Sequence, residues 1–157
     1  MKEKLYDLFI LLLTIILSVA LVSLLKRFFE ADCPWDLLRY GGEKPFYSLF
    51  EYPENMLPSK HCFPASHASV SFSWIALFFY LKVKNYQHKF KVLIAVVFMG
   101  LSFGLAQQIR GAHFLSHDIW SLIICLISAI VIYSIAYRKK AFSVSEKLFS
   151  SHDKLSN

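Results

Sequence analysis

Four long stretches with almost no charged residue limit the possible folds of this chain more than any other feature. They cover residues 5–25, 68–81, 92–106 and 119–137. A helix needs about 20 apolar residues to cross a bilayer. The first and last stretches reach that length, and the middle two can be extended into their polar flanks. We therefore predict an all-α, polytopic membrane bundle of about four transmembrane helices.

The same pattern predicts one membrane-embedded domain over residues 1–140 and a polar cytoplasmic tail over residues 141–157. We expect the tail to be loosely ordered, as chain ends often are. Ser18, Val19 and Ala20 resemble the cleavage site of a signal peptide. However, the apolar run continues to Leu25, which is too long for a signal peptide and favours an uncleaved anchor.

Basic residues indicate how the bundle is oriented in the membrane. They precede the first stretch (Lys2, Lys4), follow the second (Lys82, Lys84, Lys89, Lys91) and follow the fourth (Arg138, Lys139, Lys140). Basic loops stay in the cytoplasm, and with four helices these three groups share one side. Both termini are then cytoplasmic, and residues 30–61, with six acids and three bases, face outside. Because orientation and lipid headgroups account for the net charge of +6, no nucleic-acid partner is predicted.

Polar residues gather at the predicted outer ends of the helices. They are Lys26, Arg27, Lys60, His61, Ser66, His67, Gln107, Gln108, Arg110, His113, His117 and Asp118. Ionisable groups at membrane depth are unfavourable and usually mark a functional site. The alternative is that they are ordinary interfacial residues reaching towards water. That alternative fits Lys26 or Arg27 better than it fits the histidines.

This group of residues fits phosphoryl transfer. Pro64, Ala65 and Ser66 are typical of a helix start, with Ser66 as the N-cap, and their small side chains let an anion approach free N–H groups. Lys26 and Arg110 supply positive charge for a phosphate. One histidine can attack phosphorus while a second protonates the leaving oxygen and then activates water. Histidine suits both tasks near neutral pH.

Zinc binding is the alternative use of clustered histidines. His113 and His117 have the i, i+4 spacing of a metal-binding pair. However, the HEXXH motif is absent, and Arg110 would repel a cation. We therefore expect no metal and no other cofactor.

At these residues the sequence resembles the type-2 phosphatidic acid phosphatase family, which also includes vanadium haloperoxidases, and in particular small bacterial membrane phosphatases. The family has three motifs: Lys, six residues, Arg-Pro; Pro-Ser-Gly-His; and Ser-Arg, five residues, His, three residues, Asp. The matching segments here are Lys26 with Cys33-Pro34, Pro64-Ala65-Ser66-His67, and QIRGAHFLSHDIWS around His113. The resemblance extends over residues 26–121.

The sequence departs from the family motifs at several positions. Cys33 and Gln107 stand where the family has arginines that bind phosphate. His117 stands where the family has its aspartate, and Asp118 follows it directly. Arg110 is a candidate to replace one missing arginine.

The resemblance implies roles for these residues. His113 is the expected nucleophile, and His67 is the expected general acid and then base. His117 would orient His113 through a ring hydrogen bond, with Asp118 as the alternative orienting residue. The expected phosphate-binding residues are Lys26, Arg110, Ser66, Ala65 and Gly111. Ser66 as a simple cap and Gly111 as a simple helix breaker are the competing interpretations.

The cysteines divide between compartments. Cys33 and Cys62 both lie in the predicted outer segment, where a disulfide can form. The sequence does not supply the distance between them, so free thiols are the alternative. Cys125 lies within the fourth apolar stretch and is expected to pack as a small apolar side chain.

The resemblance implies a lipid phosphatase of the bacterial inner membrane with its site facing the periplasm or exterior. The expected substrate is a lipid phosphate monoester or diphosphate within the bilayer, since the site lies level with headgroups. A lipid phosphotransferase using the same phosphohistidine and a non-catalytic lipid-binding protein are the alternatives. The aromatic residues of segment 36–60 fit either a lid or an interfacial anchor. The small size leaves a homodimer open.

Overall fold

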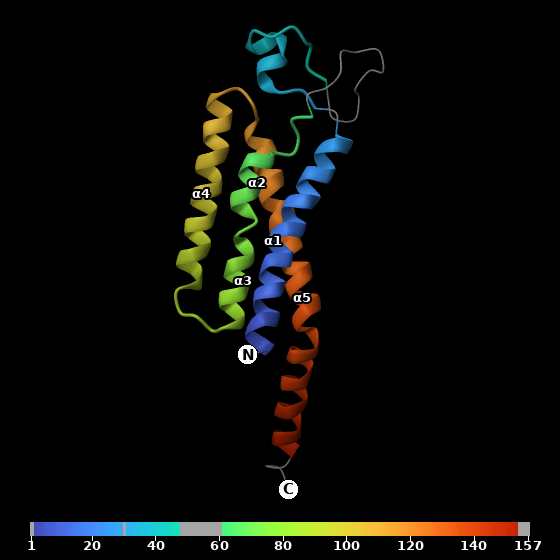
Figure 1. Ribbon diagram of the computed structural model, residues 1–157, viewed down its shortest axis with the longest axis vertical. Coiled ribbons are helices and arrows are strands. Elements are labelled where there is room, and N and C mark those ends of the chain that lie inside the picture. Colours follow the sequence, from blue (N-terminus) through green and yellow to red (C-terminus); the bar gives the residue numbers. More distant parts are fainter. Residues whose placement is uncertain (1, 30, 48–60, 154–157) are drawn as a thin grey trace.

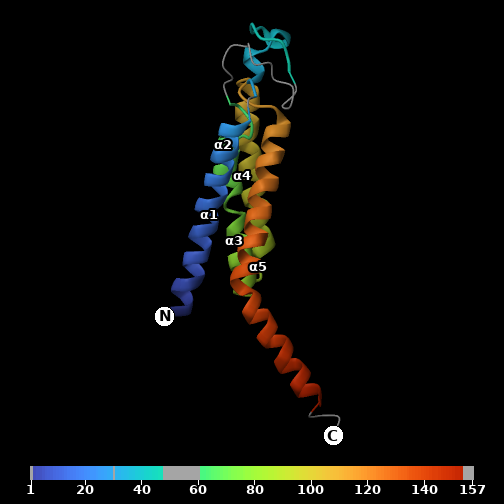
Figure 2. The same ribbon diagram turned by 90° about the vertical axis from the view of Figure 1, so that its right-hand side faces the viewer.

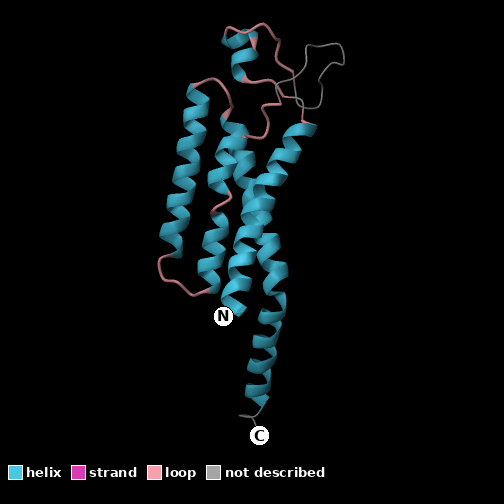
Figure 3. Ribbon diagram, in the orientation of Figure 1, coloured by secondary structure: helices cyan, strands magenta, loops and turns pink. Residues whose placement is uncertain are grey.

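The computed structural model describes residues 2–29, 31–47 and 61–153. Its long helices are α1 (Lys2–Phe28), α4 (Lys89–Ile109) and α5 (Leu115–Asp153). Its short elements are the 3-10 helices η1 (Pro34–Asp36) and η2 (Leu38–Tyr40) and the α-helices α2 (Ser66–Phe72) and α3 (Ile75–Val83). Within these described ranges there are helices and loops but no strand (Figure 3). The all-α prediction is confirmed.

Three of the helices, α1, α4 and α5, are long and apolar enough to cross a membrane, α5 over Leu115–Arg138. Helices α1 and α5 contain neither glycine nor proline, so nothing in their sequence interrupts them. Many large apolar side chains on the three helices are exposed in the isolated chain. Such surfaces suit contact with lipid, and the chain is therefore a membrane protein.

The second predicted membrane helix, residues 68–81, is divided in the structure. Helix α2 ends at Phe72, α3 begins at Ile75, and Ser73 and Trp74 form the junction. The Ser73 hydroxyl donates a hydrogen bond to the Val70 carbonyl oxygen, at 2.8 Å. Hydroxyls that bond to nearby carbonyls compete with the helical hydrogen-bond pattern. This competition explains why an apolar stretch that reads as one helix forms two.

The chain runs up and down the bundle, so both termini lie at one end. Figures 1 and 2 show α1 rising from the amino terminus, α2 and α3 descending, α4 rising and α5 descending. The turn between α3 and α4 shares the end with the termini, whereas η1, η2 and the turn between α4 and α5 lie at the opposite end (Figure 1). Helix α2 packs against α4, α5 and α1. This end of the bundle therefore gathers segments that are distant in the sequence.

The last helix is longer than the apolar pattern predicted. The pattern marked residues 119–137, and residues 141–157 were expected to be loosely ordered. In the structure α5 continues to Asp153, so that expectation is wrong for residues 141–153. The reason is local, because residues 115–153 hold no glycine or proline to end the helix.

A small residue sets how closely α2 approaches α4. A Cβ atom added to Gly100 in α4 would lie 2.2 Å from a ring carbon of Phe72 in α2. Phe72 is fully buried in the core, together with Val22, Ile75, Val96 and Cys125. Its ring therefore has little room to move away, and glycine is needed at this contact.

We expect Gly100→Ala to destabilise the folded protein by about 1–3 kcal/mol, because the added methyl group overpacks this contact. Thermal unfolding in detergent measures the change. Ser102→Ala, on the exposed side of the same helix, is the matched control and should have little effect. Adding Phe72→Leu to Gly100→Ala should recover part of the loss. Equal stability of Gly100→Ala and the parent protein would contradict the close contact.

Candidate active site

The three predicted histidines meet at the end of the bundle that carries the turn between α4 and α5. His67 is in the first turn of α2, His113 is in that turn, and His117 is in the first turn of α5. The His67 and His113 ring centroids are 6.3 Å apart, and those of His113 and His117 are 5.8 Å apart. His113 and His117 are buried, whereas His67 is exposed. An accessible imidazole therefore faces a buried one.

The surroundings of His113 keep its imidazole uncharged. Burial lowers the pKa of His113 to about 4, and the positive charge of Lys26 and the neighbouring rings of His117 and His67 act in the same direction. The backbone carbonyl of Cys62 interacts with the ring and opposes these effects. At neutral pH the ring thus has the free electron pair that a nucleophile needs.

The lowered pKa of His113 predicts a loss of stability as the pH falls from 6.5 to about 4. In this range the unfolded chain binds a proton at this residue and the folded protein does not, so acid favours unfolding. Above pH 6.5 the contribution is fully present. We expect His113→Asn, which does not titrate, to flatten the fall in unfolding temperature between about pH 7 and about pH 4.5. Parallel curves for the two proteins in detergent would contradict the lowered pKa.

The two predicted phosphate-binding cations differ in burial. Lys26 is half-buried near the end of α1, and its charge acts on both His113 and His117. Arg110 is exposed and caps the end of α4. Among the described residues, Arg110 is not one of the charges that act on His113. Lys60, which belongs to the same polar group of the sequence, lies outside the described residues.

The two candidates for orienting His113 point in different directions. The His117 ring packs edge-on against His113 and also against Phe63 and Phe114. The Asp118 carboxylate instead accepts a hydrogen bond from Gln108 Nε2 of α4, at 2.7 Å. His117 is therefore the candidate that contacts His113, but among the described residues this contact is between ring edges, and the expected hydrogen bond between the two rings is not present. Within the described part of the chain, the Nδ1 atoms of His113 and His117 are buried without a hydrogen-bond partner.

The start of α2 differs from the predicted cap. The helix begins at Ser66 and its N-cap is Ala65, so the prediction that Ser66 is the N-cap is wrong. Ala65 is fixed to α5 instead: its N–H donates to the His117 carbonyl, at 3.4 Å, and its own carbonyl accepts the Ser121 hydroxyl, at 2.9 Å. These bonds hold Ala65 outside the helix and bring His67 to the side of α5 that carries His117.

Gly111 shapes the turn that carries His113. Its φ of 71° lies in the left-handed region that glycine adopts readily. Its carbonyl oxygen accepts the backbone N–H of Trp35, at 3.0 Å. Helix η1 is thereby attached to the turn. No motif in the sequence predicts this backbone hydrogen bond, so the contact of Trp35 with the turn was not expected.

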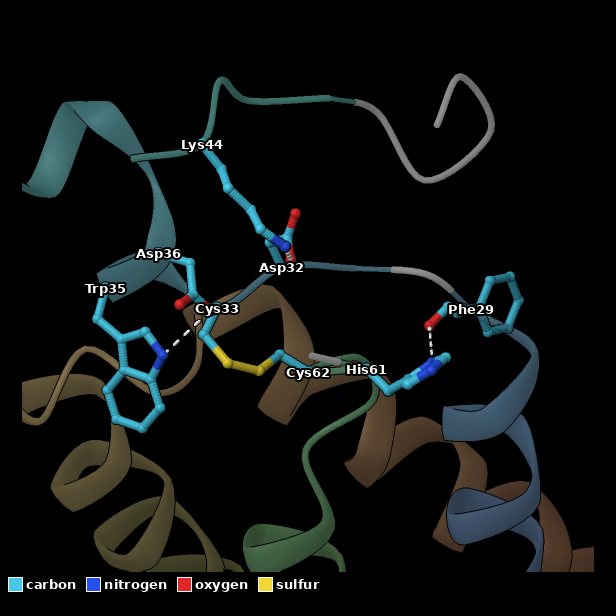
Figure 4. Close-up of a disulfide and its surroundings, with 8 residues drawn as sticks. All are labelled: Phe29, Asp32, Cys33, Trp35, Asp36, Lys44, His61 and Cys62. Atoms are coloured by element: carbon cyan, nitrogen blue, oxygen red, sulfur yellow. Dashed lines mark hydrogen bonds and ion pairs between the residues drawn. A yellow bond between two sulfur atoms is a disulfide. The ribbon is translucent and has the colours of Figure 1, made fainter. Parts of the chain in front are cut away.

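A disulfide joins Cys33 to Cys62, with 5.3 Å between their Cα atoms (Figure 4). The Cys62 N–H also donates to the Ala31 carbonyl, at 2.8 Å. His61 lies beside them, with its Nδ1 atom 3.4 Å from the Phe29 carbonyl oxygen. Residues 61 and 62 are therefore fastened to the segment that follows α1, and the alternative of free thiols does not describe this structure.

Two further residues of the site had no role in the sequence analysis. Gln108 binds Asp118, and Ser121 bridges the carbonyls of Ala65 and His117. Both are polar residues at membrane depth, and this property could have identified them as members of the site. Across the described ranges, no group of three or more His, Cys, Asp or Glu side chains is placed to hold a metal ion. Independence from metals stays a prediction, to be tested with chelators.

Comparison with known proteins gives one result that identifies the family. No curated protein and no solved structure matches the chain. The family described as the PAP2 superfamily matches residues 7–141, a range that includes every residue of the candidate site. The resemblance seen in the motifs is thereby confirmed, and the chain belongs to the PAP2 superfamily.

Proposed function

We propose that the protein hydrolyses a lipid-linked phosphate monoester or diphosphate through a phosphohistidine formed on His113. Membership of the PAP2 superfamily supports a lipid phosphatase, and the apolar helices support a membrane enzyme. The observation that carries the proposal is the approach of exposed His67 to buried His113, with ring centroids 6.3 Å apart. Half-buried Lys26, whose charge reaches His113, supplies positive charge for the phosphate.

The first step forms the phosphohistidine. A ring nitrogen of His113 attacks phosphorus, and the bond between phosphorus and the lipid oxygen breaks. His67 donates a proton to that oxygen as it leaves. His117, packed against the His113 ring, keeps the ring in the orientation for attack.

The second step releases phosphate. Water attacks phosphorus, His67 takes a proton from that water, and the bond between phosphorus and the His113 nitrogen breaks. Inorganic phosphate leaves, and both histidines return to their initial protonation states. The exposed position of His67 suits this role, because water reaches it.

The bacterial inner membrane is the proposed location, with the site at its outer face. The site lies at the end of the bundle opposite both termini and the lysine-containing turn between α3 and α4 (Figure 1). Basic segments favour the cytoplasmic side, so the site would face the periplasm or exterior. A lipid phosphate there reaches the histidines with its acyl or prenyl chains still in the bilayer.

Phosphate release from a panel of lipid phosphates tests the proposal. The panel contains phosphatidic acid, phosphatidylglycerophosphate, undecaprenyl phosphate and diphosphate, and lipid A, each with the purified protein in detergent and a chelator. We expect release from at least one lipid, and inhibition by vanadate, which mimics pentavalent phosphorus. Absence of release by a folded protein would contradict hydrolysis. Transfer of labelled phosphate to an added lipid alcohol would then identify a phosphotransferase.

A further inference from the structure

Residues 61–65 connect both catalytic segments to the rest of the outer end of the bundle. At one end of this segment, Cys62 is joined to Cys33 by the disulfide. At the other end, Ala65 is bound to the first turns of α5 through His117 and Ser121. Between these ends, the Phe63 ring packs edge-on against the His117 ring, with centroids 5.2 Å apart. The backbone carbonyl of Cys62 interacts with the imidazole rings of both His113 and His117. The placement of Cys62 therefore affects the nucleophile and its neighbour together.

The loop on the other side of the disulfide also reaches the catalytic turn. Two residues after Cys33, the Trp35 N–H donates to the Gly111 carbonyl, two residues before His113. The same loop is stiffened by an ion pair of 2.7 Å between Lys44 and Asp32 (Figure 4). The disulfide therefore joins two segments that both contact the catalytic turn. On one side Trp35 is bound to Gly111, and on the other the Cys62 carbonyl meets the His113 ring.

We infer that the Cys33–Cys62 disulfide is a positioning element for catalysis, which holds the Cys62 carbonyl against the His113 and His117 rings. This inference rests on the proposed function, because the disulfide touches neither substrate nor phosphate and acts only through the proposed roles of His113 and His117. The backbone hydrogen bonds in this region, from Trp35 to Gly111 and from Cys62 to Ala31, open more readily than a covalent bond. Without the disulfide, residues 61–63 and the two rings lose their fixed relation.

The chemistry of the disulfide gives a direct test on the folded protein. A trialkylphosphine breaks the sulfur–sulfur bond and leaves two thiols, while the phosphine is oxidised by two electrons to its oxide. Water supplies the oxygen of the phosphine oxide and the two protons of the thiols. Cys125 is buried and takes no part in this reaction.

The experiment compares phosphate release by the oxidised protein, the reduced protein and the Cys33→Ser/Cys62→Ser variant, all in detergent and below their unfolding temperatures. We expect reduction to lower kcat by about 100-fold, the scale of a displacement of about 1 Å, with little change in KM. Reoxidation should restore kcat, and mass mapping should follow the bond. A bond with only a structural role would lower the unfolding temperature and leave kcat unchanged.

Two controls separate this inference from other effects of reduction. The Cys33→Ser/Cys62→Ser variant should have the low kcat of the reduced protein and should not respond to phosphine. Lys44→Met removes the ion pair of the same loop but keeps the disulfide, and should retain kcat. If the double variant does not fold, reduction of the folded parent protein still decides the question.

The possible outcomes distinguish the two proposals. Equal kcat before and after complete reduction overturns the positioning role and leaves the proposed phosphatase intact. No release by the oxidised protein overturns the phosphatase and this inference with it. A reversible loss of kcat on reduction supports both.

Discussion

Replacement of His113 by asparagine is expected to lower phosphate release by at least about 1,000-fold, the scale seen when a nucleophile is removed. The amide cannot form the phosphorus–nitrogen intermediate, so the reaction loses its first step. The protein should still fold, because asparagine is smaller than histidine and the Nδ1 atom that it replaces has no hydrogen-bond partner among the described residues. Phosphate release and the unfolding temperature are the two measurements.

His67→Asn is the matched variant, because it removes the proton carrier and keeps the nucleophile. Its effect on lipid substrates should be about 100-fold to 10,000-fold. With p-nitrophenyl phosphate the leaving group needs no proton, so the first step proceeds while hydrolysis stays slow. The phosphohistidine should then accumulate on His113 and be found there by mass spectrometry at alkaline pH. Label on another residue, or turnover by His113→Asn, would show that the nucleophile is wrong.

Most of the fold followed from hydropathy, and the exceptions have local causes. The apolar stretches predicted α1, α4 and the membrane part of α5, because a helix is the simplest way to satisfy a backbone in lipid. They did not predict the junction at Ser73 and Trp74, since hydropathy takes no account of the hydrogen bonds that serine hydroxyls make to carbonyls. Nor did they predict how far α5 continues, because polar residues also form helices where no glycine or proline intervenes.

The sequence predicted which residues form the site better than it predicted how they are arranged. Motif spacing brought His67, His113 and His117 together, and the structure places their rings close to one another. Spacing did not show that Arg110 is exposed, or that the charge of Lys26 acts on His113. The course of the chain after Arg110 depends on the turn at Gly111, whose positive φ and backbone bond to Trp35 spacing does not predict.

A buried carboxylate at the opposite end of the bundle had no predicted role. Asp7 is the only acid in the first apolar stretch, and that isolation was the available signal. Its carboxylate forms an ion pair with Lys84 of the α3–α4 turn and accepts a hydrogen bond from the Tyr137 hydroxyl of α5. The hydrogen bond to Asp7 raises the pKa of Lys84. A lysine that the charge pattern marked as a sign of orientation therefore also links α1 to its neighbours.

We expect Lys84→Met to lower the unfolding temperature of the bundle more than the double variant Asp7→Asn/Lys84→Met, which removes both charges. The single variant removes the Lys84 cation from the buried Asp7 carboxylate, and loss of one partner of a buried ion pair is strongly destabilising. Adding Asp7→Asn removes that charge while its amide oxygen can still accept the Tyr137 hydroxyl, so the double variant should recover most of the lost unfolding temperature. Lys82→Met, in the same lysine-containing segment, is the matched control. If Lys84→Met and Asp7→Asn/Lys84→Met unfold at the same temperature, Asp7 does not depend on Lys84, and the stability of this end of the bundle comes from the packing of α1 against α3 and α5 alone.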